Sequence, residues 1–367
     1  MMKIPATTMN GQQPEHSRHA MNFKQLSITI GVAAVLATAP AQANITFNLI
    51  PDAGTPQFAI DGFNTAAGLW SSALVDNITV NIEIGFTSLG PGVIGETESA
   101  FVERSYSLVS QALGTHRTSA NDFSSFAGLQ PGASYNRLIN HTSNNPNGPN
   151  SGTPYVNTMD RVGLTTANAK ALGLLAPNNS LDAIIRFSSD FSFDFSHDTI
   201  NPGQYDFVGA ATHEIGHALG FVSGVDDIDT LNGAYPGDTF SSNLLDLFRY
   251  SALSIAAGSG FTDYTADPRD KYFSVDGGLT PIALFADGLN FGDGSQASHW
   301  KNNLGIGIMD PTAAPGEMLN ISVTDLEAMD VLGYTIPEPG AGSLFVVGLL
   351  LLLRNLRRNR SSSVLCD

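Results

Sequence analysis

The feature that most constrains this chain is the segment ATHEIGHALGF at residues 211–221. Apolar residues surround its polar pair, and Gly220 stands where the chain is able to turn sharply, so we expect an α-helix that ends at this glycine. Asp206, a few residues upstream, has the side chain that an N-cap requires. In such a helix positions i and i+4 lie on one face, so His213 and His217 direct their imidazoles at one point.

Glu214 follows the first of these histidines and completes the spacing H-E-x-x-H. Two histidines in this spacing are able to bind zinc, and the glutamate beside them is placed to take a proton from an attacking water molecule. A catalytic zinc has three protein ligands and one open position, so the motif requires a third ligand elsewhere. The alternative interpretation is a helix that carries two ordinary solvated histidines.

The candidates for this third ligand differ in their surroundings. His116 and His141 lie in polar segments and are expected at the surface, whereas His197 lies shortly before the helix and stays a candidate. His299 is distinguished by its neighbour Trp300 and by Met309, ten residues further on. Acidic residues after the helix are also able to bind zinc. These acidic alternatives are Asp226, Asp227, Glu317 and Glu327.

The combination of these motifs resembles the metzincin zinc proteases, and among them the leishmanolysin-like branch. In that branch the motif H-E-x-x-H-x-x-G is followed by an inserted segment, a third zinc histidine beside a tryptophan, and a turn with a methionine beneath the metal. The resemblance implies that His213, His217 and His299 bind one catalytic Zn²⁺. It also implies that Glu214 is the general base.

The resemblance covers residues 178 to 334, with the inserted segment at about 224–298. It implies that Gly220 is the glycine at which the chain turns and that Met309 is the methionine beneath the metal. Compact metzincins have their third histidine three residues after this glycine, and here that position is Ser223. The distal position of His299 makes this serine an expected feature of the branch.

The order of the expected elements indicates an α+β fold. We expect one metalloprotease domain at 44–335, and the resemblance implies a twisted sheet, an active-site helix and a helical C-terminal subdomain. The expected helices are 58–75, 97–113, 239–251 and 323–334, the last capped by Thr324; the expected strands are 78–86 and one or two within 181–195; residues 140–154 are expected to be a loop.

Both ends of the chain carry features of targeting segments. Residues 1–43 predict a secretory signal peptide, whose true start is either Met1 or Met21, with an A-x-A site for signal peptidase. Residues 336–367 combine Pro-Glu-Pro, an apolar run and arginines, and they resemble the PEP-CTERM signal of Gram-negative bacteria. The resemblance implies an exosortase-type partner and a transmembrane C-terminal helix. We therefore expect a protein exported across the inner membrane and then surface-bound, matrix-associated or secreted.

The charge of the chain excludes some partners. Ten Lys and Arg against 31 Asp and Glu between Asn44 and Pro337 give this part a net charge of −21. Such a surface repels nucleic acid, and we expect a monomer without nucleic-acid partners. Cys366 is the only cysteine, so the expected mature chain has no disulfide. The Asp-rich segments 225–233 and 290–296 raise the possibility of Ca²⁺, but solvated turns explain them better because neither has an EF-hand spacing.

These features predict an exported zinc endopeptidase that acts on proteins or peptides, with Glu214 as its base. Two alternatives stay open. The first is a surface or biofilm-matrix protein with a structural or vestigial zinc site, for which the retained glutamate has no use. The second is a zinc hydrolase that acts on a non-peptide amide.

Overall fold

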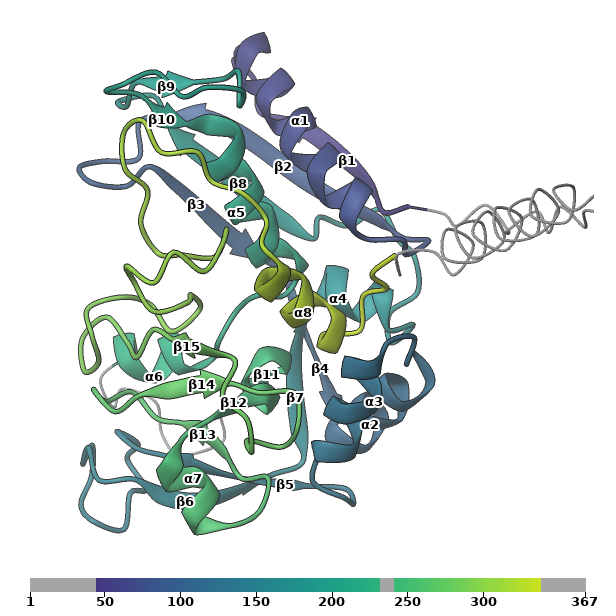
Figure 1. Ribbon diagram of the computed structural model, residues 1–367, viewed down its shortest axis with the longest axis vertical. Coiled ribbons are helices and arrows are strands. Elements are labelled where there is room, and N and C mark those ends of the chain that lie inside the picture. Colours follow the sequence, from purple (N-terminus) through teal and green to yellow (C-terminus); the bar gives the residue numbers. More distant parts are fainter. Residues whose placement is uncertain (1–43, 232–240, 338–367) are drawn as a thin grey trace, which may run out of the picture. The chain divides into compact units, whose positions relative to one another are not determined.

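The computed structural model describes residues 44–231 and 241–337. The chain divides into two units, Met1–Pro40 and Ala41–Asp367, and every described residue belongs to the second. The expected signal peptide (1–43) and nearly all of the expected sorting segment lie outside the described residues. Helices combine with twisted mixed sheets, which confirms the α+β class (Figure 1). Within the two described ranges, every helix is too short or too polar to span a membrane.

The sheet beside the site has four strands in the order β1-β2-β8-β3. The strands β1, β2 and β8 run parallel, whereas β3 pairs with β8 in the antiparallel direction. β3 is therefore an edge strand. The backbone N–H and C=O groups on its outer side have no partner strand in the sheet. The bounds of these strands are β1 Thr46–Pro51, β2 Thr79–Thr87, β8 Ala183–Ser188 and β3 Gly95–Ser99.

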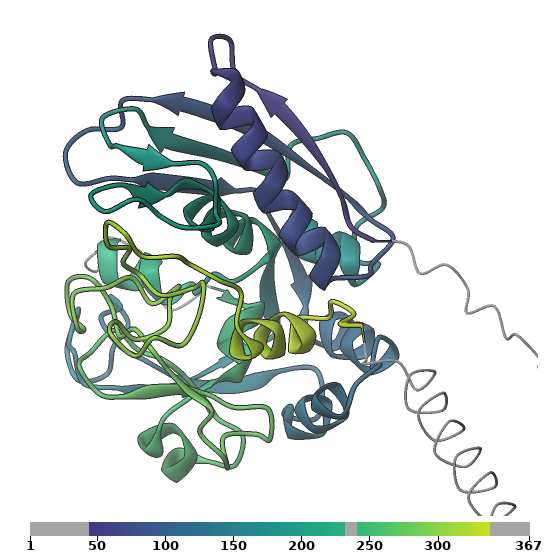
Figure 2. The same cartoon turned by 45° about the horizontal axis from the view of Figure 1, so that its top comes forward.

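Two helices, α1 (Gln57–Ala73) and α5 (Phe207–Leu219), pack against each other on one face of this sheet (Figure 2). The ring of Phe63 on α1 lies 5.3 Å from that of Phe207 on α5 and 5.5 Å from that of Phe187 on β8. These edge-to-face contacts connect the two helices with the sheet. The apolar face expected for the first helix is confirmed, since Phe63, Ala66, Ala67, Trp70 and Leu74 are all buried.

The expected helix at 97–113 is wrong in its first half. Residues 95–105 form β3 and then β4 (Phe101–Ser105), and the helix α2 begins only at Tyr106 and ends at Thr115. The exposed and half-buried residues of β3 alternate, and both strands have partners in their sheets. β3 pairs with β8, and β4 pairs with β7 (Arg161–Thr165). The secondary structure of this segment is determined by pairing with strands that are distant in sequence. A local sequence pattern contains no information about such pairing.

The segment after α5 differs from the expected helical subdomain, because it mixes short strands with short helices. The expected helix at 239–251 is wrong: η1, a short 3₁₀-helix, lies between strands β11 and β12. The final helix α8 is confirmed, although its N-cap is Ser322 and not Thr324. The elements here are α6 Val225–Leu231, β11 Ser242–Asn243, η1 Leu244–Phe248, β12 Arg249–Tyr250, α7 Ala252–Ala257, β13 Thr262–Tyr264, β14 Lys271–Phe273, β15 Ala283–Phe285 and α8 Val323–Val331.

The remaining elements lie between β4 and α5 along the chain. The expected loop at 140–154 is confirmed, since it joins β5 to β6 without a helix or strand. The elements are α3 Ala120–Gly128, β5 Tyr135–Ile139, β6 Tyr155–Met159, β7 Arg161–Thr165, α4 Thr166–Ala171, β9 Phe193–Asp194 and β10 Tyr205–Asp206.

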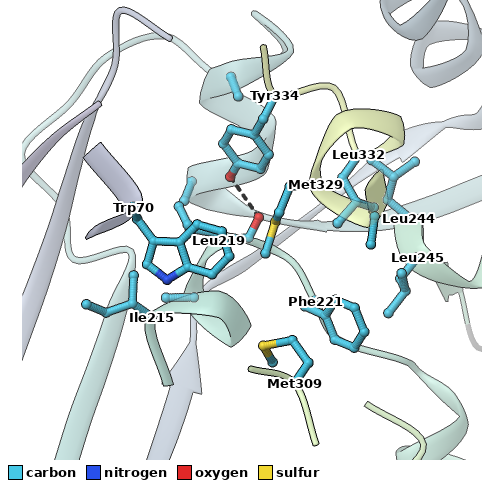
Figure 3. Packing of buried hydrophobic residues seen from close by; sticks show 14 of the residues in the cluster. Trp70, Ile215, Leu219, Phe221, Leu244, Leu245, Met309, Met329, Leu332 and Tyr334 are labelled. Carbon is cyan, nitrogen blue, oxygen red and sulfur yellow. Dashed lines mark hydrogen bonds between the residues drawn. The ribbon is translucent and has the colours of Figure 1, made fainter. Parts of the chain in front are cut away.

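The hydrophobic core joins α5 to the segments that follow it in the chain (Figure 3). Trp70, Leu219, Met309 and Tyr334 are buried together, and the hydroxyl of Tyr334 donates a hydrogen bond to the carbonyl oxygen of Leu219 at 2.7 Å. The core therefore extends from the four-stranded sheet, through α5, to the segment before α8. This continuity brings Met309 beneath the helix that carries H-E-x-x-H.

Candidate metal centre

The helix α5 begins and ends as its sequence predicts. Asp206 is the N-cap, and its carboxylate accepts a hydrogen bond from the backbone N–H of Gly209 at 2.9 Å. Gly220 closes the helix in the left-handed conformation, with φ of 118°, which a side chain disfavours. Between these caps one turn of helix separates His213 from His217, so both imidazoles lie on one face.

His299 approaches this face from a segment 82 residues beyond His217. Its Nε2 atom lies 3.2 Å from Nε2 of His213 and 3.3 Å from Nε2 of His217, and the two helical histidines have their Nε2 atoms 3.0 Å apart. Ligand nitrogens on a tetrahedral zinc, at about 2.0–2.1 Å from the ion, lie about 3.3 Å apart. The three side chains form the single group of three or more metal-ligating residues found in the described ranges.

The other ring nitrogen of each histidine determines the tautomer. Nδ1 of His213 lies 2.7 Å from the carbonyl oxygen of Ile308, Nδ1 of His217 lies 2.8 Å from that of Phe221, and Nδ1 of His299 lies 3.1 Å from that of Gln296. A carbonyl oxygen only accepts, so each Nδ1 donates and each neutral ring presents an Nε2 lone pair. Such backbone partners fix ligand orientation in metal sites.

The protonation state of two rings agrees with this arrangement. Burial lowers the pKa of His217 to about 3, with the neighbouring His213 acting in the same direction. Burial also holds the pKa of His299 well below its ordinary value, and His217 and His213 add to the effect. Neutral rings with three lone pairs facing one point repel each other, and a cation at that point removes the repulsion. The donor set therefore fits a metal ion.

Glu214 lies beside the three histidines and is 9% exposed. The hydroxyl of Thr97, on the edge strand β3, lies 2.6 Å from Oε2 of this glutamate and donates to it. Burial raises the pKa of the Glu214 carboxyl above its ordinary range, while His213 and the Thr97 hydroxyl oppose the rise and Glu96 adds to it. The result is a buried carboxyl group of increased proton affinity beside the three imidazoles.

Met309 lies under the helix, in a turn closed by the N–H of Asp310 donating to the carbonyl oxygen of Gly307 at 3.3 Å. The methionine is fully buried, and its sulfur would lie 2.6 Å from a β-carbon at Gly216, so only glycine allows this close packing. Met309 therefore packs against the helix that carries His213 and His217. The structure thus brings Met309 against the last turns of the helix that Gly220 ends.

Asp325 holds this turn, and sequence reasoning missed it. Its fully buried carboxylate accepts hydrogen bonds from the N–H of Ile308 at 2.8 Å, the N–H of Met309 at 3.3 Å and Nε1 of Trp300 at 2.8 Å. The same residue completes the capping box of α8 with Ser322. The S-x-x-D spacing at the start of α8 indicates the cap, but the contacts with the turn depend on tertiary structure.

The other candidates for the third ligand lie apart from the three histidines. His197 contacts the carboxylate of Asp206 at 2.8 Å, and the ring of His141 stacks on that of Phe291 at 3.8 Å. No described acidic residue belongs to the histidine group, and no second group of three such ligands, including acidic ones suited to Ca²⁺, occurs within 44–231 and 241–337. The residues that stand outside the group are His116, His141, His197, Asp226, Asp227, Glu317 and Glu327.

A cleft of about 570 Å³ opens over the histidines. It is lined by residues 92–97, the last three of which belong to β3, and by residues 310–313, which follow Met309. The cleft is also lined by His213, Glu214, His217 and His299, and neither lysine nor arginine lines it.

Comparison with known proteins adds no relative to this picture, because no protein-family model matches the chain and neither the curated proteins nor the solved structures contain a significant match.

Proposed function

We propose that this protein is a zinc-dependent endopeptidase of the metzincin type, exported and sorted through its two ends. The observation that carries the proposal is the convergence of three Nε2 atoms within 3.0–3.3 Å, each ring fixed by a backbone carbonyl, beside a buried glutamate. Zinc has the affinity for imidazole nitrogen that such a set requires. The base beside the ligands favours a catalytic site over a structural one, since a structural site has no use for it.

His213, His217 and His299 would hold the ion, which would supply Lewis-acid chemistry and lower the pKa of a water molecule. Glu214 lies beside these ligands and takes the proton of the attacking water. The hydroxyl of Thr97 donates a hydrogen bond to Oε2 of this carboxylate. Oε1 lies beside Gly95, where a β-carbon would come within 3.1 Å of it, so the glycine leaves space next to the base. Glu214 then returns the proton to the leaving amine.

The edge strand β3 favours a peptide as the substrate. The carbonyl oxygen of Ile94 accepts from the N–H of Ser188, and the N–H of Ala100 donates to the carbonyl oxygen of Asp182. In an antiparallel pair such bonds alternate, so the backbone groups of 95, 97 and 99 point to the opposite, free side of β3. An extended peptide gains main-chain hydrogen bonds by adding to such an edge. A small non-peptide amide would leave most of this edge unused.

The proposal is tested with four purified proteins: wild type, Glu214→Gln, His299→Ala and, as the control, His116→Ala, which changes a histidine outside the metal group. Zinc binding is measured by calorimetry, and hydrolysis is measured with casein as the substrate. We expect about one zinc per chain in wild type and Glu214→Gln, and at least about a hundredfold slower hydrolysis in the latter. His299→Ala should lose more than about a hundredfold in zinc affinity, because it removes a ligand.

Full zinc affinity in His299→Ala would contradict the ligand set. Zinc binding without hydrolysis of casein or of a peptide library by wild type would favour the structural or vestigial site. Cleavage of small amides but not of peptides would favour the non-peptide hydrolase.

A further inference from the structure

Ser223 lies three residues after Gly220, and its neighbours connect the end of α5 to the segment that supplies His299. The backbone N–H of Ser223 donates to Oγ of Ser298 at 2.9 Å, across 75 residues of sequence. Both residues are buried, with 5% and 8% of their surface exposed. Ser298 directly precedes His299, so this hydrogen bond acts one residue away from the candidate ligand.

Asp226, in the first turn of α6, also holds the segment directly before His299. Its carboxylate accepts hydrogen bonds from the N–H of Ala297 at 2.6 Å, the N–H of Ser298 at 3.1 Å and the hydroxyl of Ser298 at 2.5 Å. The Ser298 hydroxyl therefore donates its one hydrogen to Asp226 and accepts from the backbone N–H of Ser223. Hydrogen bonds to a carboxylate are stronger than those between neutral groups.

Asp246, which is fully buried in η1, anchors the other end of this arrangement. It accepts from the hydroxyl of Ser223 at 2.6 Å, from the N–H of Gly224 at 2.9 Å and from the N–H of Asn243 at 2.8 Å. The turn after α5 is thus fastened to η1 on one side and to the His299 segment on the other. We name Ser223, Asp226, Asp246 and Ser298 the Ser–Asp clamp.

We propose that the Ser–Asp clamp positions His299 for metal binding, so that its residues are positioning residues that act through this ligand. The inference rests on the proposed metal site at the three histidines. Bringing His299 back to His217 closes a long loop, and closing a loop costs conformational entropy. The clamp closes that loop with hydrogen bonds beside the ligand, so little remains to be ordered when the metal binds, and preorganisation of this kind increases affinity.

The test is a double-mutant cycle on the full chain, with Ser298→Ala, His299→Ala and the double variant. Zinc dissociation constants are measured by competition with a chromophoric chelator, and the visible absorption of the Co²⁺-loaded proteins reports ligand geometry. Ser298→Ala should bind zinc about ten- to a hundredfold more weakly and alter the Co²⁺ spectrum. In the His299→Ala background the same substitution should have no further effect.

Ser251→Ala is the matched control. Its hydroxyl is also buried and donates to a buried aspartate, Asp263, at 2.5 Å, but it caps α7 and contacts none of the three histidines. It should lower thermal stability as Ser298→Ala does and leave zinc affinity unchanged. If Ser298→Ala does not fold, Asp226→Asn takes its place in the cycle, and Ser298→Thr, which keeps the hydroxyl, should retain affinity within a few fold.

An equal loss of zinc affinity from Ser298→Ala with and without His299 would overturn the inference, since the clamp would then act on the fold in general. Wild type that binds zinc but cleaves no peptide would contradict the proposed protease function. The double-mutant cycle would then still test whether the Ser–Asp clamp positions His299. Wild type that binds neither zinc nor Co²⁺ would contradict both.

Discussion

Thr97 and Glu214 form a contact that joins the edge strand to the motif helix through one hydroxyl group. The hydroxyl lies 2.6 Å from the carboxylate oxygen Oε2 and 3.0 Å from the backbone carbonyl oxygen of the same glutamate. Without this donor the carboxylate would be free to turn away from the cleft. The residue that orients the proposed base is thus 117 positions away from it in sequence.

Thr97→Val should lower kcat for casein hydrolysis by about ten- to a hundredfold, because a hydrogen bond to a charged group contributes about 1.5–3 kcal/mol. KM and zinc content should stay close to those of wild type, since the substitution affects neither the histidines nor the backbone of β3. Thr97→Ser restores the hydroxyl and should recover most of the activity. Steady-state kinetics with metal analysis checks this, and a parallel loss of zinc in Thr97→Val would contradict the assigned role.

At the scale of elements, the close packing of α1 on α5 depends on a glycine. A β-carbon at Gly62 would lie 2.5 Å from the ring of Phe207, which is fully buried between the helices and the sheet. The ring is rigid and enclosed, so it cannot move aside without displacing its neighbours. Gly68, in the same helix, is exposed and has no atom within 4 Å of such a β-carbon.

Gly62→Ala should therefore lower the free energy of unfolding by about 1–3 kcal/mol through overpacking. Gly68→Ala should raise it by about 0.5–1 kcal/mol, because alanine favours the helix and nothing obstructs its methyl group. Urea unfolding of the zinc-free proteins followed by circular dichroism measures both. Equal effects of the two substitutions would show that the helices are not packed as closely as described.

For the whole molecule, the chain has a net charge of −17, and some of its few cations are paired with acids of low exposure. Asp267 contacts Arg269 at 2.7 Å and Lys271 at 2.9 Å, next to β14. Burial alone would raise the pKa of Asp267, but hydrogen bonds and charge from Arg269 and Lys271 outweigh it and lower the pKa to about 2. A carboxyl group whose folded pKa is depressed stabilises the fold only while it is ionised.

This sign predicts the acid dependence of stability. The contribution of Asp267 is complete above its ordinary pKa of 3.8 and is lost as the pH falls towards about 2, and the difference corresponds to about 2 kcal/mol. The unfolding free energy of Asp267→Asn should be lower at pH 5 and should fall less steeply between pH 5 and 2. Asp270→Asn, which removes an exposed partner of Lys301, is the control and should keep the wild-type slope. Identical slopes for wild type and Asp267→Asn would contradict the prediction.

Local sequence determined the elements whose signals are complete within a few residues. The caps of α5 at Asp206 and Gly220, the buried face of α1 and the strand at β2 follow from side-chain periodicity and capping chemistry, and all agree with the structure. The H-E-x-x-H spacing likewise determines that two imidazoles share a face, because helix geometry is independent of the rest of the fold.

Tertiary structure decided everything that needs a distant partner. Residues 97–105 have the composition of a helix, but β8 and β7 offer them backbone hydrogen bonds, and so they form strands. Residues 242–250 become two short strands around a 3₁₀-helix for the same reason. Periodicity within a segment contains no information about strand pairing. Pairing depends on which other strand the fold brings alongside the segment.

The same division applies to the candidate metal centre. The chemistry of His299 and its resemblance to a distal ligand were visible in the sequence, but Thr97, Asp325 and the Ser–Asp clamp were not. A serine, a threonine or an aspartate is common in any chain, and it acquires a role here only through a hydrogen bond to a residue that the fold brings near it. Sequence by itself determined which side chains are able to bind a metal; only the folded structure decided that three of them meet and which buried polar groups hold them there.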